Sequence, residues 1–182
     1  MNTATKNLEE DHVSILKLID VMEIMTDNSD PAIADLEEVV DLIRNFADGL
    51  HHAKEEKLFF PLMAERGFSL TQGPVAVMLS EHEQGRNYVK GISENIQLVK
   101  DGDLSSLNLV YSNMLGYGEL LRNHIAKENN VLFRMADNAL SAEDQQSLLQ
   151  QFTEVENHGS SNQQKNDFIA RIEKLSHTYH PS

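Results

Sequence analysis

Apolar residues recur along most of the chain with the period of an α-helix. Near the N-terminus, Leu8, Ile15 and Ile19 keep the i, i+7, i+11 spacing of one helix face, and His12 falls inside the same stripe. Breaks in this pattern coincide with glycine and proline. We expect four long helices near residues 6–26, 31–66, 74–101 and 104–138, and two shorter ones near 142–156 and 162–176.

Residues at the expected boundaries suit helix ends. Asp30-Pro31 is typical of an N-cap followed by the first helical residue, and Gly67 and Gly73-Pro74 bracket the connection between the second and third helices. Ser141 and Asp144 have the spacing of a capping box, with Asp replacing the usual Glu or Gln.

The fold class follows from helix length. At about 1.5 Å per residue, the second and fourth helices would be on the order of 50 Å long and must pack lengthwise. The sequence therefore predicts an all-α, up-down-up-down antiparallel four-helix bundle over residues 1–140. Residues 141–182 would form a C-terminal helical extension and tail, packed on the bundle or on a second copy of the chain through apolar residues: Leu148, Leu149, Phe152, Phe168, Ile172 and Leu175.

Composition narrows the class of partner. The 182 residues suit one domain, and 15 Lys plus Arg against 29 Asp plus Glu give a formal charge of −14. That charge disfavours nucleic acid and anionic membranes. The chain contains no apolar run near the roughly 20 residues of a membrane span and no signal peptide at the start, so we expect a cytoplasmic protein. His177 and His180 are expected in a solvated tail.

A repeated string carries the candidate chemistry. The segment 51–60, HHAKEEKLFF, recurs in thinned form at 124–133, HIAKENNVLF. Each copy offers a His and a Glu one helical turn apart, and each is preceded by a further His one helix upstream, His12 and His82. Each half of the chain is therefore a helix pair that carries His and then His-x-x-x-Glu.

Helix phase indicates which of these side chains face the core. In the fourth helix an inward stripe runs through the repeat: Val110, Met114, Tyr117, Leu121, His124, Glu128, Val131 and Met135. In the second helix both His51/Glu55 and His52/Glu56 have i, i+4 spacing. At about 100° per residue, His51 and Glu55 fall on the apolar side, His52 at its edge and Glu56 on the solvated side.

Buried imidazoles and carboxylates without partners cost several kcal/mol each. Any one of these histidines could be a hydrogen-bonded core residue, but an inward His from every helix favours a metal pair. Since the chain has no Cys, the ligands must be His and carboxylate, a set that suits iron, manganese or zinc.

These segments resemble the hemerythrin-like, or HHE cation-binding, family over about residues 8–138. The resemblance implies a four-helix bundle around two iron ions, oxo- or hydroxo-bridged, with zinc or manganese as substitutes. It implies that Glu55 and Glu128 bridge the ions, that His12 and His51 hold one, and that His82 and His124 hold the other: the predicted metal ligands are His12, His51, His52, Glu55, His82, His124 and Glu128.

Departures from the family pattern concern three positions. The oxygen carriers have His-x-x-x-His on the third helix, whereas His82 is followed by Arg86, and His52 is placed to supply the missing imidazole. Glu128 stands where the carriers have Asp one residue later. Arg86 is either an ion-paired residue at the bundle edge or a cation in the ligand pocket. Tyr117 and Tyr88 are either core residues or hydrogen donors.

The resemblance implies binding of oxygen, peroxide or nitric oxide at a carboxylate-bridged iron pair. Two alternatives stay open: a peroxidase- or catalase-like di-iron enzyme that uses Arg86, and an iron or redox sensor that acts through the C-terminal helices. The extension also leaves room for a homodimer or a protein partner.

Overall fold

The computed structural model describes residues 3–158 and 165–179, and these residues form helices without strands. The predicted all-α class is confirmed. In chain order the elements are α1 (Ala4–Met25), α2 (Ile33–Leu42), η1 (Ile43–His52), η2 (Glu55–Phe59), α3 (Phe60–Glu65), α4 (Gly73–Lys100), η3 (Leu104–Ser106), α5 (Leu107–Lys127), η4 (Glu128–Leu132), α6 (Phe133–Ala139), α7 (Ala142–His158) and α8 (Lys165–Tyr179).

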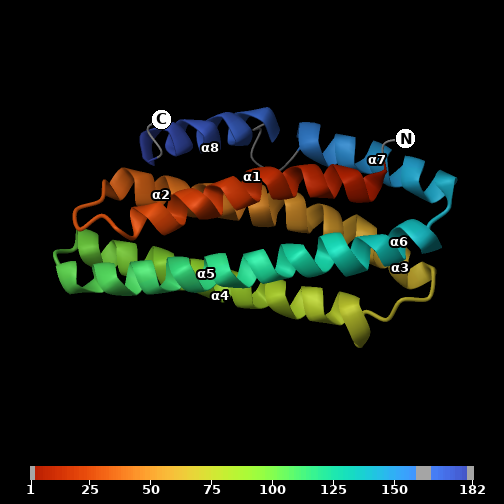
Figure 1. The fold of residues 1–182 in the computed structure, drawn as a ribbon, viewed down its shortest axis with the longest axis horizontal. Helices are drawn as coiled ribbons and strands as arrows, with labels where there is room; N and C mark the ends of the chain where they lie inside the picture. Colours follow the sequence, from red (N-terminus) through yellow and green to blue (C-terminus); the bar gives the residue numbers. More distant parts are fainter. Residues whose placement is uncertain (1–2, 159–164, 180–182) are drawn as a thin grey trace.

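Four long helical stretches lie lengthwise beside one another, as expected for a bundle (Figure 1). α2 to α3 run as one stretch and η3 to α6 as another. α4 and α5 approach closely because glycine stands at their contact: a Cβ at Gly116 would lie 2.5 Å from a ring carbon of Tyr88. The half-buried Tyr88 ring is thus a packing residue of the α4–α5 interface.

The helix boundaries agree with the sequence except at one point. Gly67 and Gly102 follow helix ends with φ of 98° and 103°, the left-handed conformation that glycine adopts without strain. The capping box is present, since the Asp144 amide donates to Ser141 Oγ and the Ser141 amide donates to Asp144 Oδ2. The predicted cap at Asp30 is wrong. The Asp30 amide donates to the Asn28 side chain in a turn, and the helix begins only at Ile33.

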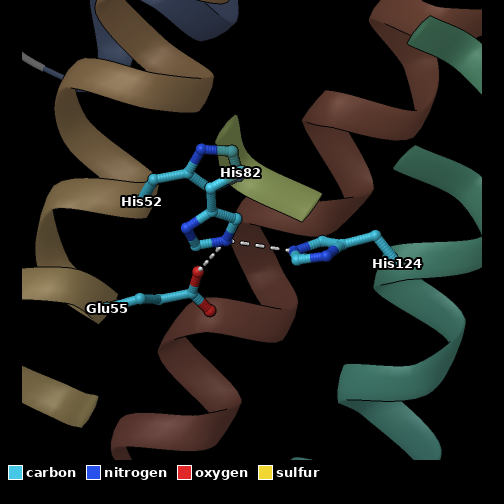
Figure 2. Close-up of side chains that lie close together, drawn as sticks. All are labelled: His52, Glu55, His82 and His124. Atoms are coloured by element: carbon cyan, nitrogen blue, oxygen red, sulfur yellow. Dashed lines mark hydrogen bonds and ion pairs between the residues drawn. The ribbon is translucent and has the colours of Figure 1, made fainter. Parts of the chain in front are cut away.

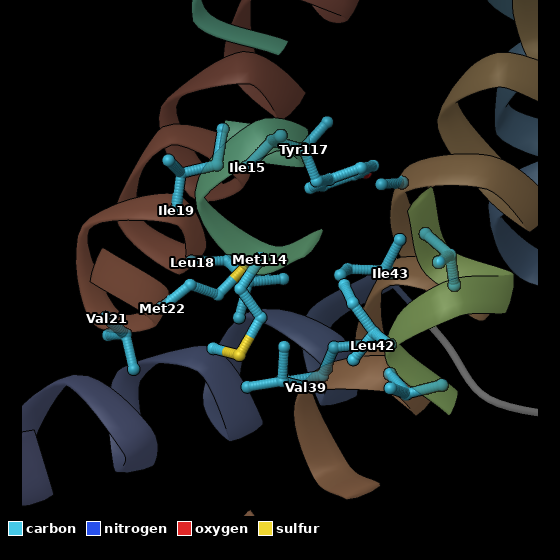
Figure 3. Close-up of a cluster of buried hydrophobic side chains, with 14 of the residues drawn as sticks. Ile15, Leu18, Ile19, Val21, Met22, Val39, Leu42, Ile43, Met114 and Tyr117 are labelled. Carbon is cyan, nitrogen blue, oxygen red and sulfur yellow. The ribbon is translucent and has the colours of Figure 1, made fainter. Parts of the chain in front are cut away.

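Two apolar clusters fill the bundle, and each long stretch runs from one to the other. The first, drawn in part in Figure 3, includes Ile15, Leu50 and Leu121. The second includes Leu8 and Phe59. Between the two clusters each stretch carries its His and Glu residues, so the polar side chains lie near mid-bundle with apolar packing at both ends.

The helix phase shifts at η4, within the second copy of the repeat. η4 is a π-helical segment with i→i+5 hydrogen bonds, and its wider turn shifts the residues that follow. Val131 and Met135, predicted to face inward, are 50% and 39% exposed, while Leu132 and Phe133 are buried instead. The predicted stripe is therefore correct up to Glu128 and wrong beyond it.

α7 and α8 lie along the outer side of α1 (Figure 1). Phe152 of α7 is buried in the second apolar cluster and Phe168 of α8 in the first. The division of the chain at residue 140 stays a prediction. His177 is exposed, as expected, and His180 lies outside the described residues. No helix among the described residues is long and apolar enough to cross a membrane.

Candidate metal centre

Seven buried side chains from all four long stretches meet at mid-bundle. α1, α4 and α5 each supply one imidazole, and the π-helical segments supply two more and both carboxylates. None of the seven is more than 4% exposed. They are the predicted ligands: His12, His51, His52, Glu55, His82, His124 and Glu128. The structure therefore brings every predicted ligand to one place, and their coordination of metal stays a prediction.

The first group of candidate ligands is His12, His51, Glu55 and Glu128, with one ligand atom of each within 4.8 Å of the others. His12 Nε2 lies 3.1 Å from His51 Nε2 and 3.2 Å from Glu128 Oε2. His51 Nε2 lies 3.7 Å from Glu55 Oε1. The Nε2 atoms and the carboxylates converge on a point that a cation would fill.

The second group is His52, Glu55, His82 and His124 (Figure 2). His82 Nε2 lies 3.2 Å from His124 Nε2 and 3.4 Å from Glu55 Oε2. The His52 ring stacks on His82 with centroids 3.7 Å apart. His52, placed by phase at the edge of the apolar face, is thus buried beside the other two imidazoles.

Glu55 belongs to both groups, and Glu128 of the first group also contacts a histidine of the second. Glu55 faces His51 with Oε1 and His82 with Oε2. Glu128 Oε2 lies 3.2 Å from His12 and 3.3 Å from His124. All four carboxylate oxygens, and His52 Nε2, are buried without a hydrogen-bond partner. Such atoms are costly unless a cation or donor meets them, so the two clusters fit a carboxylate-bridged metal pair.

The other ring nitrogen of each histidine has a partner of its own. Nδ1 contacts Asn129 at His12 (2.8 Å), Asp11 at His51 (3.2 Å), Asp48 at His52 (3.2 Å), Glu56 at His82 (2.7 Å) and Glu81 at His124 (3.0 Å). A proton on Nδ1 leaves Nε2 as the metal-binding atom and fixes the ring. At His12, His51, His82 and His124 the Nε2 atom faces a shared carboxylate, and His52 Nε2 is buried without a hydrogen-bond partner.

Sequence reasoning missed part of this outer shell. The prediction that Glu56 is solvated is wrong, because its carboxylate is only 26% exposed and lies 2.7 Å from His82 Nδ1. The π-helical segment that begins at Glu55 breaks the 100° phase on which that expectation rested. Asp11 and Glu81 directly precede His12 and His82, but each contacts a histidine of another helix, His51 and His124. Contacts between helices have no signal in one sequence.

The nearby carboxylates raise the pKa of three of the five imidazoles. Burial lowers the pKa of His124, but the charge of Glu128, its hydrogen bonds with Glu128 and Glu81, and the charge of Glu55 together outweigh burial and raise the pKa to about 10. Burial also opposes protonation of His12 and His82, yet Glu128 and Glu55 respectively raise the pKa of each. A cation at this centre must displace those protons.

The remaining two imidazoles are shifted in the opposite direction. Burial, assisted by the nearby His82, lowers the pKa of His52 well below its ordinary value. Burial lowers the pKa of His51 as well, although Glu55 and Asp11 oppose it. Neutral imidazole is the form that binds metal, so these two rings are ready as ligands.

A cavity of about 150 Å³ reaches the second group from the surface. Its lining comes mainly from η1 and α4: Ile43, Arg44, Asp48, His52, His82, Gly85, Arg86, Val89, Lys90 and Tyr117. Arg86 donates to Asp48 (Nε to Oδ1, 3.0 Å) and to Glu56 (Nη2 to Oε1, 2.7 Å). Arg86 is therefore ion-paired, the first of the two roles considered for it from the sequence. Its contacts hold the two carboxylates that orient His52 and His82.

Curated relatives share parts of the sequence. An "Iron-sulfur cluster repair protein YtfE" of Escherichia coli O157:H7 is 32% identical over 88 residues, 47% of this chain and 40% of the relative, and the protein of that name from Enterobacter sp. (strain 638) is 32% identical over 89 residues. The chain thus spans well under half the length of these relatives. An uncharacterized protein of Mycobacterium tuberculosis (strain CDC 1551 / Oshkosh) is 24% identical over 180 residues, 94% of this chain and 69% of the relative.

No solved structure matches the chain significantly. The model of the hemerythrin HHE cation-binding domain matches residues 3–136, which include all seven buried side chains and both copies of the repeat. The matched region ends before α7, so α7 and α8 lie beyond it. The chain therefore belongs to the hemerythrin HHE cation-binding family.

Proposed function

We propose that this protein holds two iron ions at mid-bundle and binds oxygen, peroxide or nitric oxide there. One ion would be held by His12 and His51, and the other by three imidazoles, with Glu55 and Glu128 shared between the two. The observation that carries the proposal is the set of four buried carboxylate oxygens without hydrogen-bond partners, placed between imidazoles of both groups. The full ligand set is His12, His51, His52, Glu55, His82, His124 and Glu128.

Iron is proposed from donor chemistry. Imidazole and carboxylate together suit iron, zinc and manganese, and the cysteine-free chain offers no thiolate that would favour a softer site. A bound iron pair would supply exchangeable electrons and bind a small ligand. Zinc and manganese would occupy the same donors, so anaerobic loading with ferrous iron is the relevant starting point.

The chain's own residues would control access and orientation. The cavity of about 150 Å³ ends at His52 and His82 and is too small for a large organic substrate. Tyr117 is 3% exposed and lines this cavity, and Arg86 closes its rim through Asp48 and Glu56. We therefore propose that small oxygen or nitrogen species reach the metal pair from this side and that bulk water is largely excluded.

Metal analysis tests the metal centre. We expect about two irons per chain in wild type, fewer in Glu55→Gln and Glu128→Gln, and wild-type content in Glu65→Gln, which changes a carboxylate that is 70% exposed. Wild type with less than one iron, or glutamine variants that keep both ions, would refute the site.

Nitric oxide tests ligand binding. Anaerobic addition to the reduced, iron-loaded protein should change its absorption and paramagnetic resonance spectra. Unchanged spectra at two irons per chain would leave a metal protein without the proposed ligand chemistry.

A second candidate function is support of iron–sulfur cluster repair. It rests on the 32% identity over 88 residues with proteins that carry that name. The iron-loaded full chain should then restore activity to an iron–sulfur enzyme damaged by peroxide or nitric oxide, and the Glu128→Gln variant should not. Equal recovery with free ferrous iron at the same concentration would reject this candidate.

A further inference from the structure

The candidate ligand His51 contacts a network of charged residues that extends from the bundle to α7 and α8. The Nδ1 atom of His51 lies 3.2 Å from Asp11 Oδ2, and Asp11 is fully buried. Two ammonium groups contact the same carboxylate: Lys54 Nζ lies 2.6 Å from Oδ2, and Lys165 Nζ lies 2.6 Å from Oδ1. Lys54 is itself 0% exposed. One imidazole and two ammonium groups therefore fix the position of Asp11.

The network closes through the two C-terminal helices. Glu156 of α7 lies 2.8 Å from Lys54 Nζ and 3.2 Å from Lys165 Nζ of α8, and Asn7 Oδ1 accepts from Lys54 at 2.8 Å. The bundle supplies one carboxylate and one ammonium, and α7 and α8 supply one of each. Each of the four charges has an opposite charge within 3.2 Å when both helices are docked, and undocking α8 alone leaves two carboxylates against one ammonium. Removing one partner from such a largely buried set is unfavourable, because it leaves an uncompensated charge.

The carboxylates behind three other histidines are held by cations of the bundle itself. Asp48 and Glu56, behind His52 and His82, are held by Arg86 of α4, and Glu81, behind His124, is held by Lys127 of α5. These three carboxylates are 33%, 26% and 13% exposed. The carboxylate behind His51 differs from them, because it is fully buried and paired with a cation from outside the family-matched residues 3–136.

We propose that Lys165 and Glu156 are positioning residues for His51, and that docking of α7 and α8 is coupled to metal binding at the His12–His51 ion. This inference rests on the proposed metal centre. Docked helices hold Asp11, and Asp11 holds the His51 ring with Nε2 toward the shared carboxylates, so docking raises metal affinity. Because coupling between two binding equilibria is reciprocal, a metal bound to His51 must strengthen docking of α7 and α8 by the same factor.

Because of this coupling, the docking of α7 and α8 depends on whether metal is bound. With the ion bound, α7 and α8 are held against α1, and without it they undock more often.

Hydrogen exchange of the α8 amides in the full chain tests the coupling. In wild type, exchange over Lys165–Tyr179 should slow about tenfold when the metal-free protein is loaded anaerobically with ferrous iron. In Lys165→Met this metal-dependent slowing should be lost, and chelator should remove one of the two ions about tenfold faster, the lower end of outer-shell effects. Lys165→Arg, which keeps the charge, should restore both.

A matched control separates this network from ordinary docking. Lys17→Met removes a different α1–α8 ion pair, with Glu173, whose partners are 39% and 44% exposed and contact no candidate ligand. It should leave the metal-dependent slowing and the chelation rate as in wild type.

Three outcomes would overturn the inference, and the metal content of wild type shows whether the proposed function fails with it. If wild type holds two irons but α8 exchanges equally with and without them, the coupling is absent while the proposed function stands. The coupling is equally rejected if Lys17→Met and Lys165→Met behave alike. If wild type binds no iron, the proposed function and this inference both fail. The wild-type comparison needs no variant, so it tests the coupling even if Lys165→Met does not fold.

Discussion

Metal binding at this centre should release protons. Burial opposes protonation of His124, but the neighbouring carboxylates, Glu128 foremost, together raise its pKa to about 10. At pH 7 this ring is protonated, and a metal ion must remove its proton before Nε2 can coordinate. Removing a proton from a group with a pKa of about 10 costs about 4 kcal/mol at pH 7, at about 1.4 kcal/mol per unit.

The same argument applies with the same sign to His12 and His82, whose pKa values are also raised. Between pH 7 and about pH 10 at least one proton, that of His124, is exchanged for metal. The apparent metal affinity should therefore rise at least about tenfold per pH unit in this range, since each displaced proton contributes one factor of ten per unit.

Zinc is a suitable probe because it is redox-inert and takes the same donors. Zinc added to metal-free protein in unbuffered solution at pH 7 should release one to three protons per chain, measured with a pH indicator, and competition against a calibrated chelator should show the affinity slope. His177→Ala, at an exposed position outside the centre, should match wild type. Release of less than half a proton, or an affinity independent of pH, would refute the assigned charge states.

Three further predictions concern stability and the cavity. Metal-free protein should lose stability as the pH rises from about 6.5, the ordinary histidine pKa, toward 10, because a group whose pKa is raised in the folded state stabilises most below its unfolded pKa. Urea unfolding at a series of pH values measures this, and a rise in stability with pH would contradict it. Leu132→Ala should cost about 2–5 kcal/mol and Val131→Ala within about 0.5, and equal losses in urea unfolding would argue against the π-helical phase. A Cβ at Gly85 would lie 3.5 Å from the Tyr117 ring, an ordinary contact, so Gly85→Ala should fold and its free energy of unfolding should rise by up to about 1 kcal/mol. Because Gly85 lines the cavity, the variant should keep its metal but bind nitric oxide severalfold more slowly in stopped-flow measurements. An unchanged rate would place the ligand path elsewhere.

Variants of Arg86 distinguish a ligand-binding protein from the peroxidase- or catalase-like enzyme that the sequence left as an alternative. Arg86→Met frees Asp48 and Glu56, so we expect chelator to remove the ion at His52 and His82 about tenfold faster. If Arg86 instead acts on a bound ligand, peroxide consumption should collapse in Arg86→Met while chelation kinetics stay unchanged. Arg86→Lys is the matched variant, because it keeps the charge but loses the bidentate geometry that holds both carboxylates.

The extent of sequence-based prediction differs along the helices. Helix number, class and approximate bounds follow from the apolar period, because burying one face is a local requirement that each helix meets with its own residues. Upstream of Glu128 the inward stripe is as expected. Past it, one wide π turn moves Val131 and Met135 outward, and single-sequence phase has no signal for such a turn.

Spacing along a single helix sets which side chains share a face, so the inward histidine of every long helix, and Glu55 and Glu128 beside two of them, could be predicted from the sequence. Three features depend on how the helices pack: which imidazoles share a carboxylate, the contact of Glu56 with His82, and the contact of Lys165 of α8 with Asp11 behind His51. Glu56 and His82 are 26 positions apart in the chain, and His12 and its partner Asn129 are 117 apart. Contacts over such separations depend on how the helices pack, and packing is settled by the whole core rather than by any one segment.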